Sequence, residues 1–106
     1  MTEQEIFNTV FLGLKGQGFV RSIRAGMCMY RGPNGLKCAV GHLIPDEKYE
    51  KDFEFGPLYN VANAIGLKKF VLFLSDLQSV HDRNPNPGLM EAELHAFAES
   101  RGLTVP

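Results

Sequence analysis

Apolar residues near the start of the chain recur three and four positions apart, which is the spacing of one buried face of an α-helix. Just before them, Thr2 and Glu5 have the spacing of a capping box, in which each side chain binds a free amide of the first turn. Gly16 and Gly18 follow the last apolar position and favour a helix end. The pattern predicts an N-terminal helix with this apolar stripe: Ile6, Phe7, Val10, Phe11 and Leu14.

Two short runs of β-type residues follow, at Met27–Arg31 and Leu36–Val40, with a glycine-rich turn between them. The turn contains Asn34 and Gly35, two residue types that tolerate positive φ and therefore favour a hairpin. The pattern predicts a β-hairpin whose register stays open. Because successive side chains of a strand point to opposite faces, Cys28 and Tyr30 share one side, and Leu36, Cys38 and Val40 share one side of the second strand. Both cysteines are expected on the buried face.

The rest of the chain has helical spacing. We expect a short turn at 46–51, a helix that starts after Pro57 and stops at Gly66, a helix from Lys68 to about His81, and a last helix at 89–101. The prolines between 84 and 88 separate the last two helices. The predicted fold is α+β: an N-terminal helix, a β-hairpin and then a bundle of about three helices, in a single globular domain spanning residues 1–106.

Composition narrows the range of partners. The chain has 106 residues, a formal net charge of −1 and 44% hydrophobic residues, which gives no general attraction to nucleic acids or membranes. The basic residues Arg21, Arg24, Arg31 and Lys37 are expected on different faces, so nucleic acid is a weak hypothesis. The longest apolar run, 70–74, is far too short for a membrane span, and the acidic N-terminus lacks a signal-peptide pattern. We expect a cytoplasmic protein with reduced cysteines.

Cysteine and histidine residues raise the possibility of a zinc site. Thiolates and imidazoles suit tetrahedral zinc, but the cysteines and the first histidine lack the paired, short spacing of zinc knuckles. The alternative is that both cysteines are small apolar residues on the buried hairpin face, which is the interpretation we favour. If zinc is bound, its predicted ligands are Cys28, Cys38, His42 and His81.

A thiol hydrolase is a third hypothesis, with Cys38 as nucleophile and His81 and Asp82 as its partners. The chain offers no visible oxyanion device. Adjacent residues on a helix also point about 100° apart, so Asp82 is expected to orient His81 poorly. We favour a structural role, in which His81 complements the negative end of its helix and Asp82 hydrogen-bonds into the turn at Asn84.

Aromatic and acidic residues alternate between positions 49 and 59. If this segment is exposed, it offers aromatic anchors in an acidic field, which suits docking on a basic protein surface. The alternative is that the aromatic side chains pin a loop to the core while the acids face water. The predicted partner-binding residues are Tyr49, Glu50, Asp52, Phe53, Glu54, Phe55 and Tyr59.

Two stretches, "CMYRGPNGLKCAVGHLIPDEKY" at 28–49 and "LQSVHD" at 77–82, resemble a group of small uncharacterised phage and prophage proteins. In that group the position of His42 is often a cysteine, which would suit a zinc ligand. The resemblance implies a phage-type accessory protein in the bacterial host cytoplasm. We therefore expect a non-enzymatic protein that binds and modulates a host protein, as an inhibitor or anti-defence factor, with no cofactor. A homodimer through the hairpin edge stays open.

Overall fold

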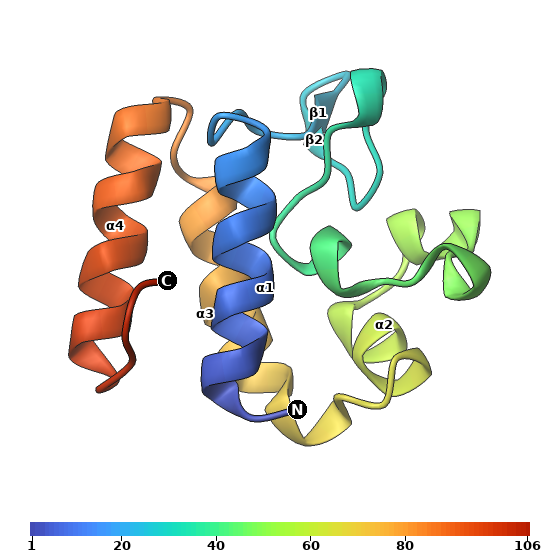
Figure 1. Ribbon diagram of the computed structural model, residues 1–106. Helices are drawn as coiled ribbons and strands as arrows, with labels where there is room; N and C mark the ends of the chain where they lie inside the picture. Colours follow the sequence, from blue (N-terminus) through green and yellow to red (C-terminus); the bar gives the residue numbers. More distant parts are fainter.

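The computed structural model describes residues 1–106 and contains four α-helices and one two-stranded antiparallel hairpin (Figure 1). The predicted α+β class and its order, helix then hairpin then helices, are confirmed. Short 3₁₀ turns occupy much of the segment between the hairpin and the second helix. The elements are α1 (Glu3–Gly16), β1 (Ile23–Arg24), β2 (Met27–Cys28), α2 (Leu58–Ala64), α3 (Val71–Asp82) and α4 (Pro87–Ser100).

The helix ends follow from local sequence chemistry. At the start of α1 the Thr2 hydroxyl accepts the Glu5 N–H at 3.1 Å, and the Glu5 carboxylate accepts the Thr2 N–H at 2.8 Å. The predicted capping box is therefore confirmed. At the start of α4 the Asn86 side chain accepts the N–H of Leu89 at 3.1 Å, and Pro87 occupies the first helical position.

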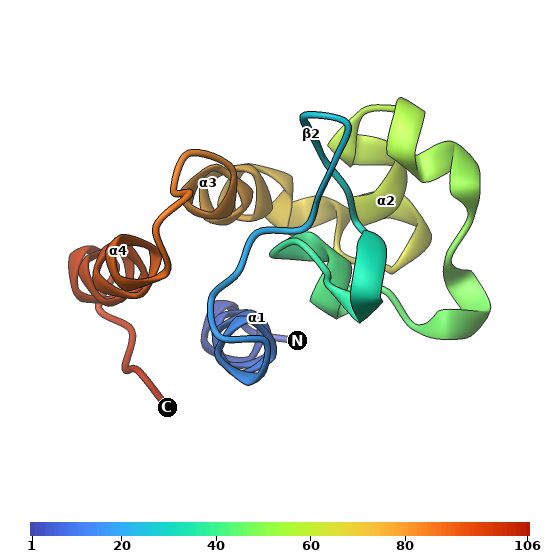
Figure 2. The same ribbon diagram turned by 90° about the horizontal axis from the view of Figure 1, so that it is seen from above.

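The core lies where α1, α3 and α4 pack against one another, and it continues from α1 and α3 to the 3₁₀ turn η2 (Val40–Leu43). This turn packs against both α1 and α3, so it fills the space between them (Figures 1 and 2). A single cluster of 20 buried residues joins these elements, α2 and parts of the intervening loops. Gly41 is required in η2, because a Cβ there would collide with the backbone carbonyl of Tyr30. None of the helices combines the length and the apolarity that a membrane crossing requires.

The hairpin lies earlier in the chain than the sequence pattern predicted. β1 pairs with β2 around Ala25 and Gly26, and the paired residues are Ile23 with Cys28 and Arg24 with Met27. Both turn residues have positive φ, 51° and 79°, as a two-residue hairpin loop demands. The predicted strand at 27–31 is therefore confirmed only for Met27 and Cys28, and the predicted strand at 36–40 is wrong. An Ala-Gly pair is a weaker turn signal than Asn-Gly, because alanine is rarely found at positive φ.

The Asn34–Gly35 turn does form, with φ values of 58° and 75°. It fails to extend into a hairpin because side chains from other elements bind the backbone groups that a ladder would use. The Glu54 carboxylate accepts the N–H groups of Tyr30 and Arg31 at 2.8 and 3.1 Å. On the other side of the turn, side-chain amides likewise occupy backbone groups. Gln17 binds the N–H and the carbonyl of Lys37, and Gln78 accepts the N–H of Val40.

Candidate functional site

The end of α3 and strand β2 bring three reactive side chains together. The Cys28 thiol, a ring nitrogen of His81 and a carboxylate oxygen of Asp82 all lie within 4.8 Å of one another. We call these residues the Cys–His–Asp cluster. Two of the four predicted zinc ligands, Cys28 and His81, belong to it, while Cys38 and His42 lie outside it.

Hydrogen bonds occupy both ring nitrogens of His81, whose side chain is fully buried. Its Nε2 accepts the backbone N–H of Ser22 at 3.1 Å, and its Nδ1 lies 2.8 Å from Oδ1 of Asp82. A backbone N–H can only donate, so Nε2 carries no proton and Nδ1–H donates to the carboxylate. His81 is therefore held as one neutral tautomer and is not the dipole-complementing cation that the sequence suggested.

Asp82 continues this network toward the loops. Its Oδ1 accepts the Gln78 side-chain amide at 2.7 Å, and Gln78 in turn accepts the Val40 N–H. The backbone carbonyl of Asp82 accepts a hydrogen bond from the Arg21 side chain at 2.8 Å. The expectation that Asp82 orients His81 poorly is wrong, because at the last residue of α3 its carboxylate turns back to the imidazole ring. The predicted bond from Asp82 into the next turn is also absent, and Asn84 binds the Val80 carbonyl instead.

Neither cysteine is set up as a nucleophile. Cys38 is 1% exposed, and burial raises the pKa of its thiol to about 12. For Cys28, burial and then the Asp82 carboxylate raise the thiol pKa to about 11. Burial also acts to raise the pKa of Asp82, but hydrogen bonds from His81, Cys28 and Gln78 outweigh it and lower that pKa. A thiol hydrolase needs a thiolate and a free base nitrogen, and Cys38, His81 and Asp82 supply neither here.

The cluster also fits zinc poorly. A metal at Nδ1 would need the ring proton on Nε2, where it would face the Ser22 N–H, so donor would meet donor. His42 packs against Gly13 of α1, with its Nε2 3.1 Å from the Gln17 side-chain oxygen. Burial and the charge of Lys37 lower the pKa of His42 to about 4. The four predicted ligands therefore do not surround one point.

The 49–59 segment divides into inward and outward side chains. Phe53 is only 8% exposed and packs edge-on against Tyr49, with ring centroids 6.4 Å apart. The Glu54 carboxylate accepts the Tyr49 hydroxyl at 2.6 Å, in addition to the two backbone N–H groups from the loop after β2. These three residues pin the loop, so the prediction that they contact a partner is wrong for Phe53, which is buried in the core cluster.

The outward side chains of this segment border a pocket of about 320 Å³ between the hairpin and the 49–55 loop. Phe55 is 82% exposed, and the nearby Glu50 and Asp52 are also exposed. We call this the hairpin pocket. It is lined by Arg24, Met29, Arg31, Tyr49, Lys51, Glu54 and Phe55.

Sequence reasoning missed the basic side of this pocket. It placed the first hairpin strand at Met27–Arg31, so Arg24 was not expected to stand opposite the 49–59 segment, and Lys51 was not among the predicted partner-binding residues. Arg31 was named only in the weak nucleic-acid hypothesis. Its guanidinium lies 4.5 Å over the ring of Tyr49, and its Nη2 binds Asp46 at 2.7 Å and the Ile44 carbonyl at 3.2 Å. The alternation of aromatic and acidic residues at 49–59 predicted the exposed aromatic residue, Phe55, but it could not predict the cations that line the pocket beside it.

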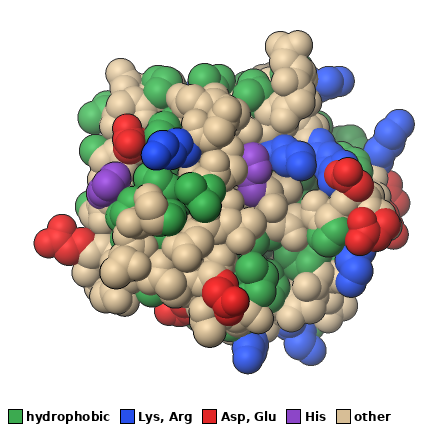
Figure 3. Space-filling model, in the orientation of Figure 1, with side chains coloured by type: hydrophobic (Ala, Val, Ile, Leu, Met, Phe, Trp, Pro, Cys, Tyr) green, Lys and Arg blue, Asp and Glu red, His purple; other side chains and the backbone are tan.

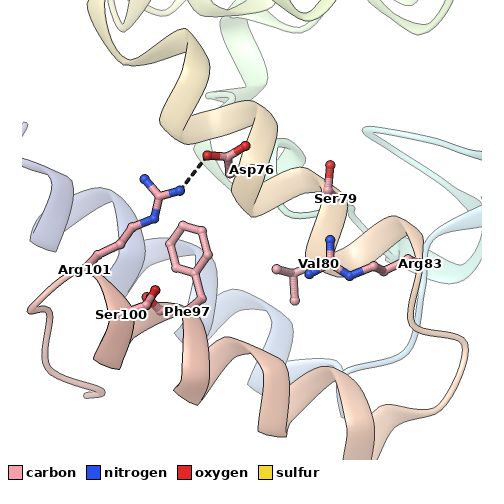
Figure 4. A pocket seen from close by; sticks show the side chains of 7 residues that line it. All are labelled: Asp76, Ser79, Val80, Arg83, Phe97, Ser100 and Arg101. Carbon is pink, nitrogen blue, oxygen red and sulfur yellow. Dashed lines mark hydrogen bonds and ion pairs between the residues drawn. The ribbon is translucent and has the colours of Figure 1, made fainter.

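A second pocket, of about 310 Å³, lies between α3 and α4. Its two arginines are already paired: Arg101 with Asp76 at 2.5 Å, as Figure 4 shows, and Arg83 with Glu93 at 2.5 Å. Arg101 also lies 4.5 Å over the ring of Phe97. Because each charge has a partner within the chain, this pocket offers a ligand less than the hairpin pocket does.

Comparison of this chain with protein-family models, with curated proteins and with solved structures finds no match.

Proposed function

We propose that this chain is a non-enzymatic binding protein, and that it contacts a protein partner through the hairpin pocket and Phe55. The observation that carries the proposal is the exposure of Phe55, 82%, at the rim of a pocket that has walls held in place by the chain's own hydrogen bonds. An exposed aromatic side chain beside a formed pocket is the usual anchor of a protein interface.

The rigidity of the pocket supports this role. Glu54 forms part of the wall and accepts three hydrogen bonds, from Tyr30, Arg31 and Tyr49. Arg31 stacks on Tyr49 in the same wall. A surface that is already ordered loses little conformational entropy on binding, which favours affinity.

The partner follows from the resemblance to phage and prophage proteins. The partner that this resemblance favours is a protein of the bacterial host, and inhibition of it is the form of modulation we propose. The Cys–His–Asp cluster supports a non-enzymatic function, because its hydrogen-bonding groups are engaged with Ser22, Gln78 and one another.

The test is capture of a partner by cross-linking in bacterial lysate, followed by identification of the captured protein. The chain offers a matched pair of exposed apolar residues: Phe55, at the pocket, and Leu72, 79% exposed at the start of α3. Phe55→Ser should abolish capture, and Leu72→Ser should leave it unchanged. Both variants should unfold at the wild-type denaturant midpoint, since exposed side chains contribute little to stability.

Capture of the same protein by wild type and by Phe55→Ser would contradict the proposal. So would the loss of capture in Leu72→Ser alone, because that result would place the interface on α3. Recovery of no specific protein, with folded and monodisperse bait, would also count against a host partner.

A further inference from the structure

The hairpin pocket carries an excess of positive charge that its own chain does not use. Resting on the proposed function, we propose that the pocket accepts a carboxylate side chain of the partner, from a segment that also places an apolar side chain against Phe55 and Met29. The ligand class is therefore an acidic and apolar peptide segment.

The charge balance of the pocket is the first support. Three cations and one carboxylate line it. The carboxylate, Glu54, already accepts two backbone N–H groups and the Tyr49 hydroxyl, so its lone pairs are largely committed to its own chain. Arg24 and Lys51, by contrast, have no ion-pair partner among the four ion pairs of the molecule. An incoming carboxylate would meet two free cations.

Arg31 is the third cation of the pocket, and its charge is already paired within the chain. Asp46 and the Ile44 carbonyl engage only its Nη2 atom. Its Nε is buried and has no hydrogen-bond acceptor in the chain, the only such buried side-chain atom found. A buried donor without an acceptor is unfavourable. The guanidinium is fixed over Tyr49 and paired with Asp46, so it orders the wall of the pocket, and the unpaired positive charge comes from Arg24 and Lys51.

The surroundings of the pocket favour a single carboxylate over an extended polyanion. Exposed acids flank it along the same segment, at Glu47, Glu50 and Asp52. Figure 3 shows acidic and basic side chains interleaved on the right-hand side of the molecule, with no continuous basic stripe. A nucleic-acid backbone would meet these acids on either side of the pocket, and the net charge of −1 adds no attraction. A peptide carboxylate with neutral or basic neighbours meets no such repulsion.

The apolar part of the ligand follows from the other lining residues. Met29 is half-buried in the pocket, and Phe55 stands exposed at its rim. Methionine adapts its shape to different apolar groups, and an aromatic ring gives a flat contact surface. Together they provide an apolar contact beside the cations, which a bare inorganic anion would not use.

The test is selection of a random displayed peptide library on the immobilised protein, with three baits. The baits are wild type, the double variant Arg24→Gln/Lys51→Gln, and the matched control Lys68→Gln/Lys69→Gln, which removes two exposed cations elsewhere. We expect peptides with an Asp or Glu close to an aromatic or aliphatic residue, retained by wild type and the control and lost by the pocket variant. In a synthetic copy of a selected peptide, replacing the acid by its amide should weaken binding by about tenfold or more.

Each other outcome has a defined meaning. Selected peptides that lack acids but still depend on Phe55 would overturn the carboxylate inference and leave the proposed function standing. Selection that yields no pocket-dependent peptide would overturn the inference. Binding of a single-stranded oligonucleotide that is lost in Arg24→Gln/Lys51→Gln would also overturn it, in favour of a nucleic-acid partner. Equal binding of inorganic phosphate and peptide would do the same, because it would show that the apolar contact plays no part.

Discussion

The Cys–His–Asp cluster and the hairpin pocket are both built on the same hairpin, and they differ in how much bonding capacity remains. Cys28 joins the cluster, while its neighbour Met29 lines the pocket. In the cluster, both nitrogens of His81 have partners. In the pocket, Arg24 and Lys51 have none. Residue types with catalytic potential thus form a hydrogen-bonded structural cluster, and ordinary surface residues form the pocket where we propose that a partner binds.

The largest effect on stability should come from replacing His81 in the Cys–His–Asp cluster. His81→Leu leaves the buried Ser22 N–H without an acceptor and removes the donor to Asp82, so the free energy of unfolding should fall by about 2–4 kcal/mol. Urea unfolding at neutral pH measures the change. His95→Gln is the control, because His95 is exposed on α4, and it should change stability by about 0.5 kcal/mol or less. An unchanged midpoint for His81→Leu would show that the cluster is not structural.

A smaller loss should follow from Glu54→Gln. The amide oxygen can replace one carboxylate oxygen, but its NH₂ group would face an N–H of Tyr30 or Arg31. We expect a loss of about 1–3 kcal/mol in the free energy of unfolding. Asp52→Asn, two residues earlier and exposed, removes the same charge and should cost much less. Equal stability of the two variants would mean that Glu54 does not hold the pocket wall.

The helices and the hairpin differ in how far the sequence alone could predict them. The helices could be predicted, because Thr2, Glu5 and the apolar stripe of α1 act within a few residues of one another. The true hairpin could not, because Ala25 at positive φ is a weak signal and the competing Asn34–Gly35 turn is a strong one. Whether that turn extends into strands depends on Glu54, Gln17 and Gln78, which lie far away in sequence.

The candidate site was predictable only in part, for the same reason. The pattern at 49–59 drew attention to Phe55, which is exposed, but not to the burial of Phe53. The cysteines and histidines were visible as reactive types, yet their state depends on the Ser22 N–H, which no spacing rule brings to His81. Long-range hydrogen bonds between side chains and backbone leave no periodic trace in a sequence.

The dependence of folding stability on pH that comes from His42 should be smaller still. His42 has a pKa of about 4 in the folded chain, below its usual 6.5, so the unfolded chain binds the proton first. Its contribution to stability is therefore complete above about pH 6.5 and is lost as the pH falls toward 4. Urea midpoints measured at pH 7 and pH 5 should differ more for wild type than for His42→Gln, in which the side-chain amide can still donate to Gln17. The same pH difference in both proteins would contradict this assignment.

Zinc should have no effect on the thermal stability of the chain. The cluster has no free lone pair at Nδ1 of His81, so an excess of zinc should leave the melting temperature unchanged. Zinc at about a hundred times a true dissociation constant would stabilise the fold by about 2.7 kcal/mol. In a domain of this size that gain would raise the melting temperature by about 10 °C or more. Such a rise, lost in Cys28→Ser, would show that the hydrogen bonds of the cluster yield to a metal.

The most direct measurement compares capture of the partner by Cys28→Ser and by Phe55→Ser, each verified as folded. We predict that Cys28→Ser captures the same protein as wild type, since Cys28 does not line the hairpin pocket and a hydroxyl takes the place of its thiol near Asp82, and that Phe55→Ser captures none. Loss of capture by Cys28→Ser, together with normal capture by Phe55→Ser, would reverse the assignment and place the function in the cluster.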